Sequence, residues 1–231
     1  MTYNRYMKEH EVQEPLILLI EALNRSPSVG RLRLSSLEPR LMTEAFVKRL
    51  SACEKVCPQF HLSLQSGCDR TLVRMNRHYT KEEYAESVRI LRKYYALPAL
   101  TTDVIAGFPG ETDEDFEASF DFIQSIAFYE LHVFPYSRRK GTAADLMPDQ
   151  VPDDVKKARA DRLLKLSEEL KSSFEEKMEG RLCEVLTEET EKKEGVTGGT
   201  GYTREYVRAF VPGIISSNVL VSGIYKGGCV L

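Results

Sequence analysis

Glycines and polar residues that could bind a ligand follow several short apolar runs of this chain. The most informative segment is DVIAGFPGE at positions 103–111, where Pro109 and Gly110 fit a type II turn. Gly107 removes a side chain where the chain leaves a predicted strand, so a ligand could approach backbone amides there. Glu111 ends the segment just before a predicted helix. An ordinary β-α turn is the alternative interpretation of the same residues.

Two further segments have the same character. Gln65 and Ser66 follow the alternating run FHLSLQ, and Pro135 and Tyr136 follow the run LHVF. Parallel α/β folds place ligand-binding groups at the carboxyl ends of their strands. The run RLRLSS also ends in polar residues. The sequence therefore contains a series of predicted strands that each end in polar or glycine-rich residues. Together they favour one shared ligand-binding rim.

An alternation of aromatic and basic residues marks the C-terminal part. If the stretch is extended, one face carries Tyr202, Arg204, Tyr206, Arg208 and Phe210. Aromatic rings between guanidinium groups can stack bases and contact phosphates, so this face is a candidate RNA-binding surface. The alternative is a half-exposed strand whose tyrosines cover the end of a barrel.

The cysteines favour structural thiols over a metal centre. Cys53 and Cys57 have a spacing that would place both sulfurs on one helix face, but Phe60 stands where a CxxxCxxC motif would continue. The five cysteines are irregularly spaced, which suggests reduced thiols and a cytoplasmic protein. We expect no metal site in this chain, and neither the histidines nor the serines suggest a catalytic group.

Helical and strand-like patterns alternate along the first two thirds of the chain. Helices are predicted at 16–24, 43–56, 80–96 and 112–126, and strands at 31–35, 60–65, 100–106 and 131–134. Thr80 with Glu83 forms a capping box, and Thr112 is suited to cap the helix that follows it. The alternation predicts an α/β fold with a parallel sheet, either open and doubly wound or part of a barrel.

The remaining sequence divides into a helix and a glycine-rich, strand-like end. Residues 153–179 predict one long amphipathic helix, with Gly180 ending it. Short alternating runs at 182–186, 206–211, 218–225 and 229–231 then predict a small all-β barrel or sandwich. The predicted organisation is therefore 1–152, an α/β domain; 153–180, a connecting helix; and 181–231, a β domain.

Composition excludes several classes of protein. The 231 residues carry a net charge of −3, which rules out nucleic-acid binding through a generally basic surface. We therefore expect no DNA partner. No apolar run is long enough to span a membrane, and the first residues lack the apolar core of a signal peptide.

The motifs resemble one enzyme family. RLRLSSLEP, HLSLQSGCDRTLVRMNRHYT, TTDVIAGFPGETDEDF and LHVFPYSRRKGT, followed by GYTREYVR, are similar to the radical S-adenosylmethionine (SAM) tRNA methylthiotransferases. The closest similarity is to the group that acts on threonylcarbamoyladenosine beside the anticodon. An unrelated (β/α) barrel lyase with a β appendage remains only if the ordered motifs are coincidence.

The resemblance implies a partial (β/α) radical SAM barrel with parallel strands, followed by a small all-β barrel like the TRAM domain. It implies that SAM contacts Gln65, Ser66, Gly107, Glu111 and Tyr136. It also implies that the anticodon stem-loop of a tRNA contacts Tyr202, Arg204, Tyr206 and Arg208.

The family also uses [4Fe-4S] clusters, and the CxxxCxxC loop that holds the SAM-cleaving cluster is absent from these 231 residues. The resemblance therefore implies a C-terminal fragment that is inactive alone. A non-catalytic protein that binds RNA through its C-terminal barrel is the alternative. A fragment of this kind would expose the edge of its first strand, near Arg31–Ser35, and could self-associate there. We also expect residues 1–14 to be poorly ordered.

Overall fold

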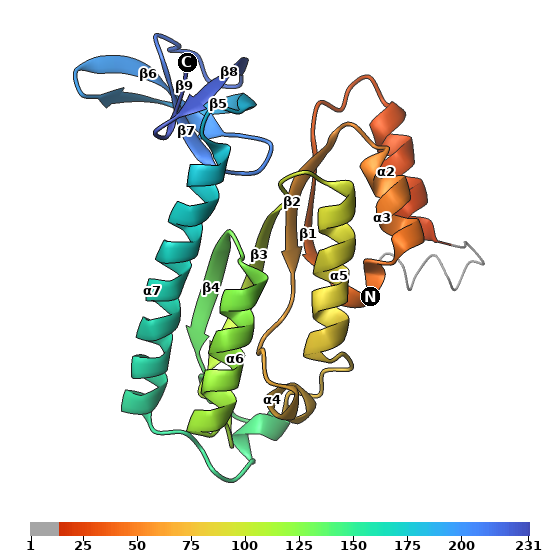
Figure 1. The fold of residues 1–231 in the computed structure, drawn as a ribbon, viewed down its shortest axis with the longest axis vertical. Helices are drawn as coiled ribbons and strands as arrows, with labels where there is room; N and C mark the ends of the chain where they lie inside the picture. Colours follow the sequence, from red (N-terminus) through yellow and green to blue (C-terminus); the bar gives the residue numbers. More distant parts are fainter. Residues whose placement is uncertain (1–13) are drawn as a thin grey trace.

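A parallel sheet forms the centre of the larger part of the molecule (Figure 1). The computed structural model describes residues 14–231, so the expectation for residues 1–14 lies almost wholly outside the described residues. The sheet contains β1 (Leu32–Leu37), β2 (Val56–Leu62), β3 (Ala99–Ala106) and β4 (Glu130–Pro135), which neighbour each other in chain order. All pairings are parallel, as the alternating pattern predicted. Within the described residues β1 is an edge strand.

Helices precede, connect and follow these strands. They are α2 (Pro15–Arg25), α3 (Glu44–Ser51), α4 (Asp69–Arg74), α5 (Lys81–Tyr94), α6 (Asp113–Ile126) and α7 (Asp153–Met178), with short 3-10 turns η1 (Pro39–Leu41) and η2 (Ala143–Asp145). Figure 1 shows α3, α5 and α6 on the same face of the sheet. The sheet is therefore one wall of a partial (β/α) barrel rather than an open sheet covered on both faces.

The capping predictions are confirmed. The Glu83 amide donates to Thr80 Oγ1 at 3.2 Å, and the Thr80 amide donates to the Glu83 carboxylate at 2.9 Å. The same reciprocal pair joins Thr112 to Asp115 at the start of α6. These caps fix where α5 and α6 begin, and so fix the loops that precede them.

The predicted boundary between the second helix and the second strand is wrong, and the strand expected at 60–65 is β2, Val56–Leu62. The helix expected to continue to Val56 ends at Ser51, and Val56 instead begins β2, paired with Leu32 of β1. A tight turn intervenes, in which the Val56 amide donates to the Cys53 carbonyl at 2.9 Å. Parallel pairing with β1 outweighs helical propensity here because it satisfies the backbone and buries Val56. Cys53 and Cys57 therefore do not share a helix face.

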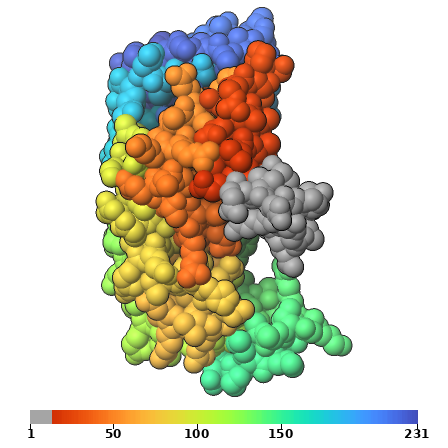
Figure 2. All heavy atoms as spheres, turned by 90° about the vertical axis from the view of Figure 1, so that its right-hand side faces the viewer, coloured from red at the N-terminus to blue at the C-terminus, as the bar shows by residue number. Residues whose placement is uncertain are grey.

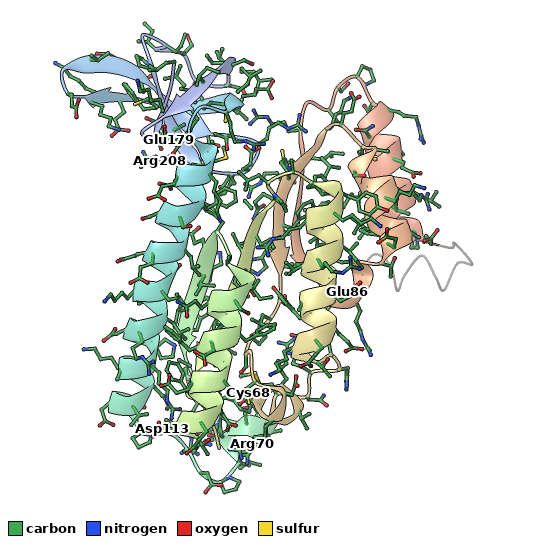
Figure 3. All side chains as sticks on the ribbon, in the orientation of Figure 1. Cys68, Arg70, Glu86, Asp113, Glu179 and Arg208 are labelled. Carbon is green, nitrogen blue, oxygen red and sulfur yellow. The ribbon has the colours of Figure 1, made fainter. Side chains whose placement is uncertain are left out.

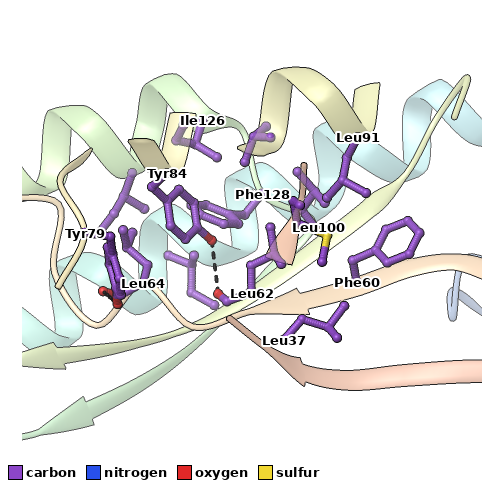
Figure 4. Packing of buried hydrophobic residues seen from close by; sticks show 14 of the residues in the cluster. Leu37, Phe60, Leu62, Leu64, Tyr79, Tyr84, Leu91, Leu100, Ile126 and Phe128 are labelled. Carbon is purple, nitrogen blue, oxygen red and sulfur yellow. Dashed lines mark hydrogen bonds between the residues drawn. The ribbon is translucent and has the colours of Figure 1, made fainter. Parts of the chain in front are cut away.

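The main core lies between the sheet and its helices. Figure 4 shows Leu62 and Leu64 beneath Tyr84 and Phe128, all of them fully buried. The Tyr84 hydroxyl donates to the Leu62 carbonyl at 3.0 Å, so this buried phenol has its partner in the core. Alternate residues of β2 point into this core, which leaves Gln59, His61 and Gln65 on the opposite face of the sheet.

A closed five-stranded barrel follows α7. It contains β5 (Leu182–Lys193), β6 (Val196–Tyr202), β7 (Arg208–Pro212), β8 (Leu220–Lys226) and β9 (Cys229–Val230), in the order β5-β6-β7-β9-β8. Phe174 and Met178 at the end of α7 belong to its core, together with Ala99 and Tyr129 from the amino ends of two sheet strands. The barrel is therefore joined to the amino edge of the sheet.

The two ends of the molecule are thus distinct. In Figure 3, Cys68, Arg70 and Asp113 lie at one end, while Glu179 and Arg208 lie at the other, beside the barrel. Figure 2 shows the red-orange segment around α2 reaching the blue barrel, where Arg31 pairs with Glu184 at 2.9 Å. Within residues 14–231, no helix combines the length and apolar character needed to cross a membrane.

Candidate ligand site at the carboxyl edge of the sheet

A cavity of about 480 Å³ lies where the sheet strands end. Gln65 and Tyr136, predicted from separate strands, both line it. Gln65 adopts a left-handed backbone conformation (φ 72°), and its amide and carbonyl still pair with Asp103 and Ile105 of β3. The sheet therefore continues past β2 and presents the Gln65 amide group to the cavity.

Tyr136 contributes an aromatic wall and an unpaired hydroxyl. Its backbone amide donates to the Ala106 carbonyl at 2.8 Å, and its ring lies edge-on to Phe108 with centroids 5.3 Å apart. The hydroxyl is buried and has no hydrogen-bond partner among the described residues. A buried hydroxyl without a partner is costly, so the site would gain from a ligand or water that supplies one.

Gly107 and Glu111 lie behind the cavity, where they stabilise the loop. The Gly107 amide donates to Glu111 Oε1 at 2.9 Å, and Arg159 Nη1 donates to the same oxygen at 2.7 Å. Burial raises the pKa of Glu111, while the Gly107 amide and Arg159 act in the opposite direction. The predicted turn at Pro109–Gly110 is present, closed by the Glu111 amide donating to the Phe108 carbonyl at 2.9 Å.

The space that the sequence suggested beside Gly107 is filled from within the chain. Gly107 has φ +74°, and an added Cβ would lie 2.4 Å from Lys156 Cγ of α7. The absent side chain therefore admits Lys156, and the amide is used by Glu111. Both facts correct the expectation of open backbone amides at this position; α7, far along the sequence, supplies the covering side chain.

Ser66 is turned away from the cavity. Its hydroxyl lies 3.5 Å from Ser119 Oγ of α6 and accepts the Cys68 amide at 3.2 Å. Of the predicted cofactor residues, the structure thus brings together Gln65 and Tyr136, while Ser66, Gly107 and Glu111 form the supporting loops.

Asp103, Phe134 and Arg139 also line the cavity and were not among the predicted site residues. Phe134 is 52 % exposed, which is unusual for a phenylalanine at the end of a parallel strand. Asp103 lies 3.5 Å from His61 Nε2, and His61 Nδ1 lies 3.1 Å from Thr101 Oγ1. Side chains alternate between the two faces of a strand, so the sequence pattern could have placed Asp103 and Phe134 on the same face of the sheet as Gln65.

The comparison with known families gives the ancestry of this site. Residues 6–123, just over half of the chain, match the Radical SAM superfamily. The chain belongs to the radical SAM superfamily. The coproporphyrinogen III oxidase of Escherichia coli, a radical SAM enzyme, has the same fold over 68 % of this chain and 37 % of its own, with a TM-score of 0.56 and 16 % identity.

Relatives with higher identity modify tRNA by name. The chain is 40 % identical over 204 residues to the tRNA-2-methylthio-N(6)-dimethylallyladenosine synthase of Caldicellulosiruptor saccharolyticus, covering 88 % of this chain and 43 % of that protein. It is 39 % identical over 214 residues to the threonylcarbamoyladenosine tRNA methylthiotransferase MtaB of Bacillus subtilis, covering 91 % and 46 %. This radical SAM chain therefore spans less than half the length of these relatives.

The expected RNA-binding strand of this radical SAM protein is not extended. β6 ends at Tyr202 and β7 begins at Arg208, so Tyr202 and Arg208 face each other across a hairpin. Tyr206 is left-handed (φ 66°), and its amide donates to the Thr203 carbonyl at 3.0 Å. The single-face alternation is therefore wrong, because barrel closure requires a turn inside this stretch.

The side chains of this hairpin join the barrel to the sheet. Tyr202 and Tyr206 stack with centroids 4.2 Å apart, and the Arg33 guanidinium of β1 lies 3.2 Å above Tyr206. Arg204 donates to the Val56 carbonyl at 3.0 Å. Arg208 alone points away from the sheet, 3.4 Å from Glu191. Phe210 is buried. Tyr206 is therefore the aromatic residue of this stretch that contacts the sheet.

The residues present do not fit an iron–sulfur cluster. Cys53 lies in the turn after α3 and Cys57 in β2, and both are buried. Burial raises the pKa of both thiols, which disfavours the thiolate that a cluster needs. Within the part of the chain that the structure describes, no three His, Cys, Asp or Glu side chains are grouped to hold a metal.

Proposed function

We propose that this chain forms the SAM-binding carboxyl edge of a radical SAM tRNA methylthiotransferase, with SAM in the cavity lined by Gln65 and Tyr136. The observation that carries the proposal is the convergence of these two residues, from separate strands, on one cavity of about 480 Å³. That volume suits a nucleoside-sized ligand.

The lining groups match the parts of SAM. Phe134 and Tyr136 offer aromatic surface for the adenine, and the Gln65 amide can donate and accept hydrogen bonds. Asp103 offers a carboxylate to the positively charged sulfonium or ammonium group, and His61 lies 3.5 Å from that carboxylate. SAM, when bound in enzymes of this superfamily, supplies a sulfonium whose carbon–sulfur bond breaks on one-electron reduction. The residues described here bind and orient it.

We propose that the 231 residues alone do not catalyse methylthiolation. The clusters that reduce SAM and supply sulfur need cysteine ligands, and these cysteines do not provide a set of them. The proposed substrate of the whole enzyme is a tRNA, at threonylcarbamoyladenosine in the anticodon stem-loop. The motif resemblance supports that nucleoside, although relatives for two different nucleosides match with nearly equal identity.

Calorimetric titration of the full chain with SAM tests the binding proposal. Gln65→Ala and Tyr136→Phe should each weaken SAM binding several-fold, whereas Tyr94→Phe, which removes an exposed hydroxyl bonded to Glu44, should not. Asp103→Asn should reduce the preference for SAM over the uncharged thioether S-adenosylhomocysteine. If the unaltered chain binds no SAM at millimolar concentration, or both site variants bind it equally well, the proposal fails.

The alternative, RNA binding through the TRAM-like barrel alone, receives less support. Of Tyr202, Arg204, Tyr206 and Arg208, the first three contact each other or the sheet, and Arg208 is paired with Glu191. Glu188 and Glu189 lie beside Arg208 in the same small cavity and would repel phosphates. The Tyr206 ring lies between Tyr202 and the Arg33 guanidinium, so it offers no free face for a base.

A further inference from the structure

Two polar side chains are buried on the face of the sheet opposite its main core, and neither lines the cavity proposed for SAM. Gln59 of β2 and Thr101 of β3 are each 5 % exposed. A buried polar group carries a desolvation cost unless it finds a hydrogen-bond partner. Here the partners form a chain of contacts across the sheet, which begins at Arg33 and ends at Asp103 in the wall of that cavity.

Arg33 fixes the orientation of the Gln59 amide group. Arg33 Nη2 donates to Gln59 Oε1 at 2.9 Å, and a guanidinium contains donors only, so the Gln59 atom that faces it must be the oxygen. The guanidinium is itself held over the Tyr206 ring, 3.2 Å from the ring centroid. The NH2 group of Gln59 therefore faces the other way, where it donates to Thr101 Oγ1 at 3.2 Å.

The next contact in the chain also has a defined direction. Thr101 Oγ1 accepts from Gln59 and lies 3.1 Å from His61 Nδ1. Within residues 14–231 the hydroxyl has no further hydrogen-bond partner, so His61 Nδ1 is the acceptor that remains for its proton. Because Nδ1 accepts, the proton of the neutral His61 ring is on Nε2.

The Nε2 proton lies on the side of Asp103. His61 Nε2 is 3.5 Å from Asp103 Oδ2, and among the described residues no other side chain is paired with that carboxylate. The opposite tautomer would turn the Nε2 lone pair toward a negative charge and would leave the buried Thr101 proton without an acceptor. Both penalties favour the Nε2–H tautomer. The ring of His132, the β4 neighbour of Asp103, lies 5.6 Å from that of His61 and packs beside it.

We propose that His61 is a positioning residue that holds the Asp103 carboxylate toward the cavity proposed for SAM. The chain from Arg33 through Gln59 and Thr101 fixes the His61 ring in one tautomer, so that a donor always faces the carboxylate. This inference rests on the proposed function and adds the residues that orient one wall of its site. A carboxylate already oriented in the free protein needs no reordering when a cationic sulfonium binds, which favours SAM over its uncharged thioether.

Long-range proton–nitrogen NMR spectra of the full chain without ligand test the tautomer. They are recorded at about pH 8, where free imidazole is neutral. The two ring nitrogens of His61 should show the well-separated shifts of a single Nε2–H tautomer. In Thr101→Val, which keeps the shape and removes the hydroxyl, the two shifts should move together as the ring exchanges between tautomers, and Thr101→Ser should restore their separation. Thr190→Val makes the same change at an exposed position of the barrel and should leave both shifts unaltered.

Calorimetric titration tests the positioning role. Thr101→Val should lower the preference for SAM over S-adenosylhomocysteine several-fold, in the same direction as Asp103→Asn, whereas Thr101→Ser and Thr190→Val should keep the preference. The Thr101→Val/Asp103→Asn double variant should lose no more preference than Asp103→Asn alone, because the hydroxyl acts through that carboxylate. A merely structural role of Thr101 would weaken the binding of both ligands equally.

The outcomes separate this inference from the proposed function. An Nδ1–H tautomer or an exchanging mixture at His61 in the unaltered chain would overturn the inference, and this measurement requires no variant to fold. An unchanged preference for SAM in Thr101→Val would also overturn it, as would additive losses in the double variant. Each of these results is compatible with SAM binding by the unaltered chain. Absence of that binding would instead refute the proposed function, and this inference with it.

Discussion

Arg159 of α7 and Glu111 of the β3–α6 loop form an ion pair that is almost closed to solvent. Arg159 Nη1 lies 2.7 Å from Glu111 Oε1, and the two side chains are 7 % and 3 % exposed. Arg159 also reaches Asp113 at 2.7 Å. The pair fixes the start of α7 to the loop that precedes α6, next to the cavity lined by Gln65 and Tyr136.

Removal of Arg159 should be strongly destabilising. Arg159→Met leaves the Glu111 carboxylate buried without its partner, and the free energy of unfolding should fall by about 3–5 kcal/mol. Arg162→Met is the control: Arg162 pairs with Glu117 at an exposed position, where an ion pair contributes about 0–1 kcal/mol. Urea denaturation of both variants measures the difference, and similar losses would contradict a special role for the buried pair.

The same pair gives a pH dependence. Burial raises the pKa of Glu111, so the carboxyl group releases its proton at higher pH in the folded chain than in the unfolded chain. Stability relative to a Glu111→Gln variant should therefore decline as pH rises from the ordinary carboxyl pKa through the folded value. Denaturation across this range measures the decline; a constant difference, or a rise, would show that Arg159 and the Gly107 amide outweigh burial.

Tyr136→Phe should have opposite effects on stability and on ligand binding. The variant removes a buried hydroxyl that has no partner, so the ligand-free chain should gain roughly 1 kcal/mol of unfolding free energy. Its SAM affinity should fall, as proposed above. Thermal melts with and without SAM measure both; a loss of stability in the ligand-free variant would mean that an ordered water already satisfies the hydroxyl.

Gly107→Ala should destabilise the chain through Lys156. The new Cβ would lie 2.4 Å from Lys156 Cγ, in addition to the strain of a positive φ. Gly141→Ala carries only the strain, since Gly141 has φ +86° and open space around it. The excess cost of Gly107→Ala should be about 1–3 kcal/mol and should shrink in the Gly107→Ala/Lys156→Ala double variant. If the stability loss of Gly107→Ala were the same in the double variant, it would come from backbone strain and not from contact with Lys156.

Tyr206→Ala should loosen the barrel from the sheet. It removes the ring between Tyr202 and the Arg33 guanidinium, a contact expected to contribute about 0.5–2 kcal/mol. Faster hydrogen exchange at the amino ends of β1 and β2, or proteolysis near Met178, would report the change. Arg208 pairs with Glu191 of the barrel, so Arg208→Ala should leave hydrogen exchange and proteolysis unchanged. Equal effects of the two variants would contradict a role of Tyr206 in holding the barrel to the sheet.

The β1 edge should cause concentration-dependent association. Within the described sheet β1 pairs only with β2, and an unpaired strand edge attracts another strand. Sedimentation velocity should show a larger species as concentration rises. A strict monomer at all concentrations would contradict this prediction.

The alternation of helices and strands in the sheet domain, the caps and the ancestry were determined by the sequence. Hydrophobic periodicity and capping residues act over a few positions, so Thr80 with Glu83 and Thr112 with Asp115 could be located from residue types alone. The parallel sheet followed from the alternation of helix and strand, and the convergence of Gln65 and Tyr136 followed from parallel strands ending at one edge.

Tertiary structure alone decided which groups face the cavity and which are covered. Lys156 fills the space beside Gly107, Ser66 turns to Ser119, and the Tyr202–Tyr206 hairpin stacks against Arg33, each through contact with a residue far away in the sequence. Local pattern does not encode such contacts, because they depend on where α7 and the barrel dock.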